Sequence, residues 1–229
     1  MASTKNTLNI LFEDNHLIIV NKQSGDIVQG DKTGDAPLSD IIKEYIKDKY
    51  NKPGNVFLGV VHRLDRPTTG VVVFAKTSKA LERFNKMLRD KKVNKTYWAI
   101  VKNLPTNLED TLTGFLLKNP KNNKSTSYSS EVNGSKKATL HYKLIKSLDN
   151  YHLLEVDLET GRHHQIRCQL AAIGCPIKGD LKYGFDRSNK DASIHLHARK
   201  IEFTHPVTKE NITLNAPTPN DPIWNACEL

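Results

Sequence analysis

The chain has 229 residues, a length that suits one domain of ordinary size or two small ones. Hydrophobic residues make up 38% and charged residues 26%, a balance typical of a globular protein and not of a disordered one. Lys and Arg number 34 against 25 Asp and Glu, so the net charge is +9. This excess favours an anionic partner such as nucleic acid, without saying which.

The sequence carries no signal for a membrane or for secretion. No apolar run approaches the roughly 18 residues of a membrane span. The first residues lack the basic start and apolar stretch of a secretory signal, so the cytoplasm is expected. Cys168, Cys175 and Cys227 form no CxxC pair and leave one thiol over in any disulfide scheme. Reduced thiols are expected, as in a cytoplasmic protein.

Apolar periodicity and turn residues predict the elements of the first half of the chain. They are, in order, a hairpin of strands 8–12 and 17–20, a helix over 38–46 with Pro37 at its start, a strand at 56–61, a polar connection at 62–70, a strand at 71–75, and a helix over 81–88 with Ser78 as its cap. The polar connection is thus expected to be a loop between two strands.

In the second half a long polar stretch interrupts the pattern and is expected to be an exposed excursion. The predicted features are a strand at 97–101, the excursion at 118–137, strands at 138–145 and 152–158, a helix over 164–173 ended by Gly174, and strands at 194–203 and 212–214. Strands outnumber helices without regular alternation, which predicts an α+β fold with a mixed, mostly antiparallel sheet flanked by helices. With no repeat or linker, residues 1–229 are expected to form a single domain.

The segment HRLDRPTTG, residues 62–70, places one carboxylate, Asp65, between two guanidinium groups, Arg63 and Arg66. An ion-paired turn explains a generic Arg-x-Asp, because structural pairs also gather charges. Two further residues favour a functional loop. Pro67 fixes φ and Gly70 permits an unusual backbone conformation, so the loop is built for a defined shape.

A second cluster gathers cationic side chains at the start of the predicted helix at 164–173. Its members are Arg162, His163, His164 and Arg167, with Gln165 among them. Positive charge there opposes the helix dipole, but together with free backbone N–H groups it suits a carboxylate or phosphate. Pairing of these cations with nearby acids such as Glu155 or Glu159 explains the cluster equally well.

Common cofactor and metal signatures are absent from the sequence. His195 and His197 share one face of a predicted strand, but no HExxH, no CxxC and no clear third or fourth ligand accompanies them. GxxxxGK[ST], GxGxxG and GxSxG do not occur either. We therefore expect no metal and no nucleotide cofactor, and little support exists for a serine hydrolase.

Six segments in order resemble the RluA-type pseudouridine synthases. HRLDRPTTG is similar to that family's HRLDxxTSG motif, and Asp65 falls on its catalytic aspartate. The accompanying segments are FEDNHLIIVNKQSG at 12–25, KTYWAIV at 95–101, TGRHHQIR at 160–167, GDLKYG at 179–184 and LHARKIEFTHPVT at 196–208. The departures are small: Gln23 stands where the family usually has Pro, and Thr69 where it often has Ser.

The resemblance implies the pseudouridine synthase catalytic fold and a cofactor-free isomerase acting on uridine in rRNA or tRNA. It assigns catalysis to Asp65, to Tyr97, which would stack on the base, and to Arg162, which would pair with Asp65. The residues expected to contact RNA are His62, Arg63, Arg66, His163, Gln165 and Arg167. The pattern begins within the first dozen residues, so we expect no S4-like domain and recognition of a compact stem-loop by a monomer.

Two other functions remain open on the residues alone. A net charge of +9 also fits a non-catalytic RNA-binding or ribosome-assembly module. The His and Asp residues also allow a metal-dependent nuclease.

Overall fold

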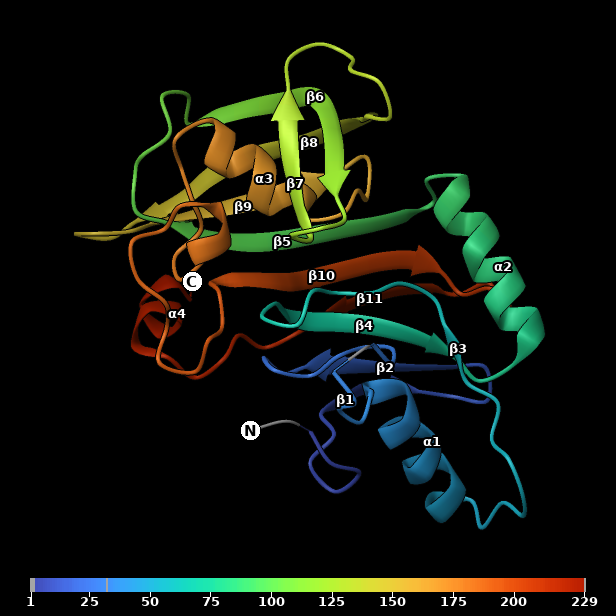
Figure 1. Cartoon of the computed structure of the whole chain (residues 1–229). Coiled ribbons are helices and arrows are strands. Elements are labelled where there is room, and N and C mark those ends of the chain that lie inside the picture. Colours follow the sequence, from blue (N-terminus) through green and yellow to red (C-terminus); the bar gives the residue numbers. More distant parts are fainter. Residues whose placement is uncertain (1–2, 32, 229) are drawn as a thin grey trace. The chain divides into compact units, whose positions relative to one another are not determined.

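The computed structural model describes residues 3–31 and 33–228, which form two compact units. Unit 1 contains the residues up to Asn94 together with Ala198–Pro219, and unit 2 contains Lys95–His197 together with the residues from Asn220 onward. Each unit therefore combines two segments that lie far apart in the sequence. Figure 1 labels the elements of both.

Unit 1 is a sheet with one helix on each face. Its strands follow the order β1-β2-β4-β10, with β3 paired to β4 and β11 to β10. The pairs β1–β2, β2–β4, β3–β4 and β10–β11 are antiparallel. The elements are β1 (Ile10–Glu13), β2 (Leu17–Lys22), α1 (Leu38–Lys49), β3 (Gly59–Val60), β4 (Thr69–Ala75), α2 (Ser78–Arg89), β10 (Leu196–Thr204) and β11 (Asn211–Asn215).

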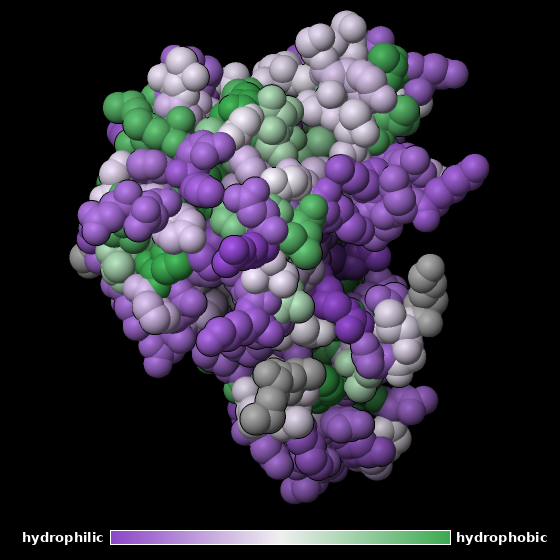
Figure 2. All heavy atoms as spheres, turned by 60° about the vertical axis from the view of Figure 1, so that its left-hand side comes forward, coloured by the Kyte–Doolittle hydropathy of each residue, from purple (hydrophilic) through white to green (hydrophobic). Residues whose placement is uncertain are grey.

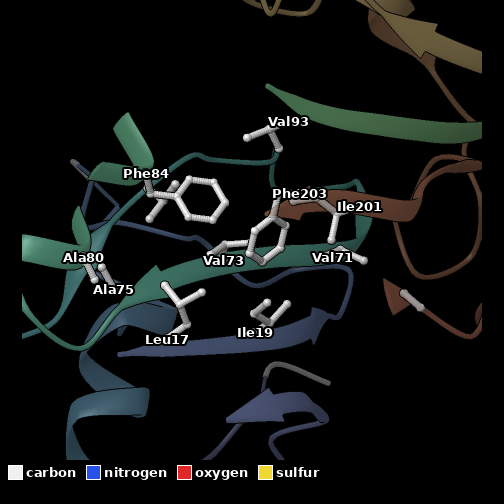
Figure 3. Packing of buried hydrophobic residues seen from close by; sticks show 12 residues of the cluster. Leu17, Ile19, Val71, Val73, Ala75, Ala80, Phe84, Val93, Ile201 and Phe203 are labelled. Atoms are coloured by element: carbon white, nitrogen blue, oxygen red, sulfur yellow. The ribbon is translucent and has the colours of Figure 1, made fainter. Parts of the chain in front are cut away.

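The helices lie on opposite faces because side chains alternate along a strand. Every residue of β2 and β4 is buried. Ile18 and Phe74 pack in one cluster with Ile42 of α1. Their neighbours Leu17 and Val73, which point the other way, pack in a second cluster with Ala80 and Phe84 of α2 (Figure 3). A strand buried on both faces is expected to contain a continuous apolar run, and β2 and β4 contain the runs LIIV and VVVFA.

Unit 2 contains a second run of strands in the order β5-β9-β8-β6-β7. The pairs β5–β9, β9–β8, β8–β6 and β6–β7 are all antiparallel. The elements are β5 (Val93–Val101), most of which belongs to this unit, β6 (Glu109–Asn119), β7 (Lys124–Tyr128), β8 (Lys136–Ser147), β9 (His152–Leu158), α3 (Gln165–Ala172), η1 (Leu181–Tyr183) and α4 (Pro222–Cys227). The predicted α+β class with a mostly antiparallel sheet flanked by helices is confirmed.

Residues 118–137, expected to be an exposed excursion, contain an ordered hairpin. β7 pairs with β6 from Phe115↔Tyr128 to Asn119↔Lys124, and Ser125 within it is 2% exposed. The stretch is mostly exposed, as expected, but its strand pairing was not predicted because this part of the sequence is rich in Lys, Asn and Ser and lacks an apolar alternation. The pairing of β6 is decided by the neighbouring β8, which supplies its ladder of hydrogen bonds.

Three smaller details also differ from the sequence-based expectation. The strand predicted at 56–61 is only the two residues of β3. The cap of α2 is Thr77 and not Ser78, since the Thr77 side chain accepts the Ala80 N–H at 3.2 Å. The C-terminal helix α4 was not predicted; Asp221 caps it and Trp224 anchors it at 2% exposure.

The exposed residues are mainly hydrophilic. On the face drawn in Figure 2, hydrophilic side chains predominate and the hydrophobic areas between them are small. The three cysteines are free and buried. Among the described residues, no helix combines the length and the apolar character that crossing a membrane requires.

Replacing Phe84 by Ala should destabilise unit 1. The Phe84 ring is fully buried and meets Phe203 edge-on at 4.9 Å between centroids. Its truncation leaves a cavity and should lower the free energy of unfolding by about 3–5 kcal/mol, as measured by chemical denaturation. Phe57, which is 48% exposed, is the matched control, and its replacement by Ala should change that energy by less than about 0.5 kcal/mol. Equal effects of the two substitutions would contradict the packing described.

Candidate active site

The loop between β3 and β4 carries four of the residues that the sequence singled out. Asp65 and His62 are half-buried, whereas Arg63 and Arg66 are exposed. The Thr68 N–H donates to the carbonyl of Asp65 at 3.0 Å and closes a tight turn around the carboxylate residue. Unit 1 therefore gathers these residues on one short, folded loop whose two ends are fixed in strands.

A buried lysine is hydrogen-bonded to the backbone of this loop. Lys22, the last residue of β2, is 1% exposed, and its Nζ donates to the carbonyls of Gln23 at 3.0 Å, Arg66 at 3.0 Å and Thr68 at 2.7 Å. Three donors meet three acceptors, so the ammonium is fully satisfied. Two of the three carbonyls belong to the loop that carries Asp65.

The charge of Lys22 is balanced between burial and nearby carboxylates. Burial lowers the pKa of the Lys22 ammonium from 10.5 to about 8, while the carboxylates of Asp26 and Asp65 act to raise it. Lys22 is thus coupled electrostatically to Asp65 as well as to the backbone around it.

Two glycines are required by the backbone of this region. Gly70, at the start of β4, has φ +113°, and a Cβ there would meet the carbonyl oxygen of Ala198 in β10 at 2.4 Å. No side chain fits so close an approach of two strands. Gly25, with φ +92°, donates its N–H to the carbonyl of Arg66 at 3.1 Å and adds a further tie to the loop.

The side chains of the loop differ in how firmly they are held. His62 Nε2 accepts the N–H of Val73 at 3.2 Å, which fixes the imidazole against β4. Arg66 reaches Asp35 at 2.5 Å and Thr33 at 3.0 Å, but both partners of the Arg66–Asp35 pair are more than 40% exposed. An exposed pair of this kind contributes little to stability, so Arg66 can exchange Asp35 for another anion.

In unit 2, Tyr97 lies in the middle of β5, opposite Val156 of β9, and is 7% exposed. Its neighbours Thr96 and Trp98 are tied to β9 by side chains on the other face of the strand. The Trp98 indole N–H donates to Glu155 at 3.2 Å, and the Thr96 hydroxyl donates to Asp157 at 2.6 Å. Tyr97 therefore stands on a rigid support.

β9 leads directly into the second predicted cluster. Arg162 is exposed, and its Nε donates to the carbonyl of Lys137 at 3.0 Å. Gln165 is 3% exposed: its Oε1 accepts the Thr160 hydroxyl at 2.8 Å and the Arg162 N–H at 3.0 Å, and its Nε2 donates to Thr139 O at 3.0 Å. The Gln165 amide thus ties the segment at 160–165 to β8.

Arg167 is directed inward and forms a buried pair with Asp180. Arg167 Nε lies 2.7 Å from one carboxylate oxygen and NH2 lies 2.8 Å from the other, and the two side chains are 6% and 1% exposed. The guanidinium also lies over the Tyr183 ring at 5.1 Å. This bidentate pair joins α3 to the segment GDLKYG.

The two histidines of this segment stack on one another at 3.7 Å between ring centroids. His163 Nδ1 lies 2.9 Å from the Ser125 hydroxyl of β7, and His164 Nδ1 lies 2.9 Å from the Tyr183 hydroxyl. Tyr183 in turn accepts the Ser125 N–H at 2.8 Å, and burial raises its pKa to about 12. These contacts fasten the β6–β7 hairpin to the start of α3. His164 itself has φ +53°, in the left-handed region.

The histidines weighed as metal ligands have other partners. His195 hydrogen-bonds Asn189 through Nδ1 at 3.0 Å and Asp221 through Nε2 at 3.2 Å, and His197 meets Trp224 edge-on. Within residues 3–31 and 33–228, no group of three or more His, Cys, Asp or Glu side chains is placed to hold a metal ion.

Each unit thus brings together one group of the predicted residues, His62 to Arg66 in unit 1 and Tyr97 with Arg162 to Arg167 in unit 2. A family model described as RNA pseudouridylate synthase matches residues 16–172, a range that includes both groups up to Arg167. The chain belongs to this family. It is an RNA pseudouridine synthase, an isomerase, and the resemblance to the RluA type is confirmed.

Relatives of known name support the assignment. The synthase is 35% identical to an uncharacterized RNA pseudouridine synthase of Synechocystis over 93% of this chain and 66% of the relative, and 33% identical to ribosomal large subunit pseudouridine synthase D of Zymomonas mobilis over 93% and 70%. The chain therefore spans about two thirds of the length of these relatives. The solved structure of human RNA pseudouridylate synthase domain containing 4 covers 93% of the chain, with TM-score 0.77 and 24% identity, and shows the same fold.

Sequence reasoning did not single out Lys22, Asp180 or Tyr183, although all three lie in segments that carry the family resemblance. The sequence held one signal for Lys22, which stands at the end of a strand that begins with the apolar run LIIV. A lysine at such a position is expected to reach solvent, but Lys22 is buried. Asp180 and Tyr183 gave no such signal, since their partners Arg167 and His164 lie more than a dozen residues away.

Replacing Lys22 by Met should loosen the loop that carries Asp65. Methionine keeps the length of the side chain but leaves three carbonyls without their donor, so the free energy of unfolding should fall by about 3 kcal/mol at pH 7. Because the folded pKa near 8 lies below 10.5, wild type gains stability relative to the variant as pH rises through this interval. Denaturation curves from pH 7 to 10 measure both effects.

Lys43→Met is the control, since the pair that Lys43 forms with Asp40 at 2.9 Å is exposed. It should change the free energy of unfolding by less than about 0.5 kcal/mol at every pH. A Lys22→Met variant as stable as this control would contradict the role assigned to Lys22.

Proposed function

We propose that this synthase converts uridine to pseudouridine in a structured element of rRNA or tRNA, with Asp65 as the catalytic carboxylate. The observation that carries the proposal is the support of Asp65. Its loop is tied by Lys22 through two carbonyls, by Gly25 through a third contact, and by a turn from Thr68. A catalytic group must be held firmly, and this loop is held from several sides.

The reaction needs a carboxylate and no group donor. The bond between uracil N1 and ribose C1′ breaks, the base turns, and C5 bonds to C1′ with loss of the C5 proton and return of a proton to N1. No net oxidation or reduction occurs, so no cofactor is required by the chemistry. A carboxylate can attack as a nucleophile or stabilise positive charge at C1′, as carboxylates do in glycoside cleavage.

Tyr97 and Arg162 serve the same reaction in this proposal. Tyr97 offers a ring on a rigid strand for stacking of the uracil. Arg162 supplies a guanidinium that the resemblance to the family assigns to the same catalysis. His62, Arg63, Arg66 and His163 contact the RNA, whereas Gln165 and Arg167, which are buried and internally bonded, position the segment that carries Arg162.

Ribosomal RNA is the first candidate substrate, because relatives of Zymomonas mobilis and Buchnera aphidicola are named ribosomal large subunit pseudouridine synthases D and C. A tRNA is the second candidate substrate. A uridine inside a helix must be flipped out at a cost of a few kcal/mol, so a stem-loop with an unstacked uridine is favoured. We propose that the whole chain acts in the cytoplasm as one catalytic domain and as a monomer, with binding that weakens as salt rises.

Asp65→Asn should abolish catalysis and leave RNA binding intact. The amide has nearly the same shape but cannot act as a nucleophile or anion. Tritium release from RNA labelled at uridine C5 should fall by at least about 10³-fold, while the dissociation constant changes by less than about threefold. Glu210→Gln, an exposed carboxylate on the β10–β11 turn, is the control and should retain full activity.

The same assay separates the alternatives. Activity retained by Asp65→Asn would refute the catalytic assignment and favour an RNA-binding module. Cleavage of the RNA that stops in EDTA and returns with a divalent metal would indicate a nuclease instead.

Tyr97→Phe tests whether the hydroxyl takes part in chemistry beyond stacking. Phenylalanine preserves the ring, so RNA affinity should change by less than about threefold, while kcat should fall by about 10²-fold if the hydroxyl orients the base or carries a proton. Tyr97→Leu should lose affinity as well, because the stacking surface is gone. Full activity of Tyr97→Phe would limit Tyr97 to stacking.

A further inference from the structure

Unit 2 contains a cavity of about 480 Å³ that none of the proposed catalytic roles uses. It lies where the end of β5, the turn before β9 and the loop after η1 meet. Its lining residues are Lys102, Tyr151, Lys178, Phe185, Asp186, Arg187, Ser188 and Asn189. The volume falls within the range of small-ligand sites.

The lining combines positive charge with aromatic surface. Three cationic side chains and one carboxylate face the cavity, so its charge is positive. Tyr151 and Phe185 are half-buried and supply two aromatic rings. Cations beside aromatic rings are the combination that binds single-stranded nucleic acid, because phosphates pair with the cations and bases stack on the rings.

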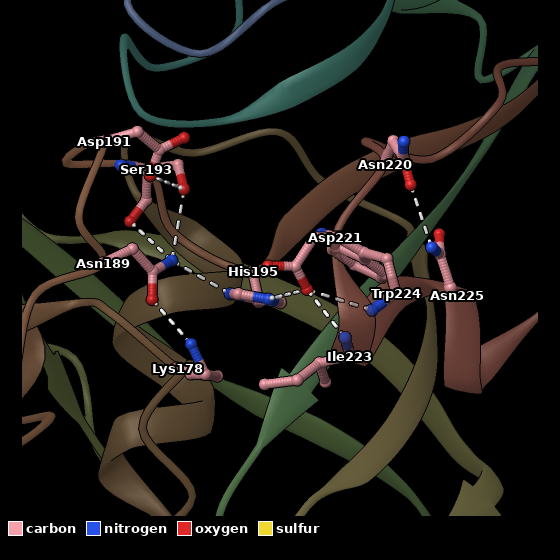
Figure 4. Close-up of polar contacts among 10 residues, drawn as sticks. All are labelled: Lys178, Asn189, Asp191, Ser193, His195, Asn220, Asp221, Ile223, Trp224 and Asn225. Atoms are coloured by element: carbon pink, nitrogen blue, oxygen red, sulfur yellow. Dashed lines mark hydrogen bonds and ion pairs between the residues drawn. The ribbon is translucent and has the colours of Figure 1, made fainter.

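One of these cations is held in place before any ligand arrives. Lys178 Nζ donates to Asn189 Oδ1 at 2.7 Å and lies 5.8 Å from the centroid of the Tyr151 ring. The Asn189 amide nitrogen is itself fixed by the Ser193 carbonyl at 3.0 Å and by His195 Nδ1 at 3.0 Å (Figure 4). This chain of hydrogen bonds orients the Lys178 ammonium. Burial lowers the pKa of Lys178, so a bound anion would stabilise its charged form.

The other two cations can be recruited by a ligand. Lys102 pairs with Asp186 at 3.2 Å, but the two side chains are 57% and 72% exposed, so the pair is weak and exchangeable. Arg187 is exposed and forms no hydrogen bond or ion pair with the residues that the structure describes. A phosphate entering the cavity meets one fixed cation and two adaptable ones.

We propose that this cavity binds a nucleotide of the substrate RNA a few positions away from the reacting uridine, with its base on Tyr151 and its phosphate on Lys178, Lys102 and Arg187. The proposal rests on the proposed function. RNA is favoured over a free nucleotide because Lys102 directly follows β5, the strand that carries Tyr97. Five residues of strand span roughly 16 Å, a distance that a few nucleotides of one RNA cover.

The test measures RNA affinity and KM for charge variants of the cavity, on the stem-loop that contains the uridine mapped as modified. Lys102→Ala and Arg187→Ala should each weaken binding about fivefold at 0.1 M salt, raise KM and leave kcat within twofold, and each should reduce the salt slope by about 1. Asp186→Asn should act in the opposite direction and tighten binding, because it removes the competing carboxylate. If these residues had a purely structural role, removing the cations and removing the carboxylate would not change RNA affinity in opposite directions.

Lys190→Ala is the matched control for charge. Lys190 is exposed in the same loop but does not line the cavity, so its removal should change affinity less than twofold. Tyr151→Phe should keep the affinity and Tyr151→Leu should lose it, because stacking needs the ring and not the hydroxyl. Shortening the RNA to the target uridine and its immediate neighbours should bring the charge variants to the affinity of wild type.

The outcomes separate this inference from the function on which it rests. If wild type releases tritium while Lys102→Ala and Arg187→Ala behave as Lys190→Ala does, the cavity does not bind the substrate RNA and the function stands. Uridine monophosphate that binds in a Tyr151-dependent way, with RNA affinity unchanged in all variants, would overturn the RNA proposal in favour of a free nucleotide. If wild type releases no tritium from any RNA, the proposed function itself fails.

Discussion

The buried ammonium of Lys22 is the constraint on which the loop of Asp65 depends. A lysine carries three donors on a flexible stem, and here all three meet backbone carbonyls, of Gln23, Arg66 and Thr68. A loop has few backbone partners of its own, so such a side chain replaces the ladder that a strand would provide. Its burial is costly, which the lowered pKa near 8 reflects. The carboxylates of Asp26 and Asp65 offset part of that cost.

In unit 1 a single cation, Lys22, fixes the loop that carries Asp65. In unit 2 several polar side chains fix the segment that carries Arg162. The segment that carries Arg162 is held by the Gln165 amide, by the Arg167–Asp180 pair and by the Tyr183 hydroxyl. Buried polar groups of this kind are stable only when every member is satisfied. Because these contacts join the segment to β8 and to residues 179–184, the segment cannot move without breaking several contacts at once. The exposed Arg162 is thereby presented on a fixed support.

Several features could be predicted because their signals are local. The apolar runs of β2 and β4 and the helical spacing of α1 need no knowledge of distant residues. β6 and β7 were not predicted, since β6 gains its ladder of hydrogen bonds from β8, and β7 gains its own from β6. Gln165 and Arg167 looked like RNA ligands because a cationic or polar side chain is expected outside, but both found internal partners.

The sequence by itself determined the α+β class, the family and the position of the carboxylate in HRLDRPTTG, because these depend on residue type, spacing and order along the chain. The tertiary structure decided which charged and polar groups are used internally. Lys22, Arg167 and Asp180 are buried, whereas Lys102 and Arg187 remain at the surface beside Tyr151. Burial and pairing are set by elements that meet from distant parts of the chain, and lysine and arginine occur in both groups.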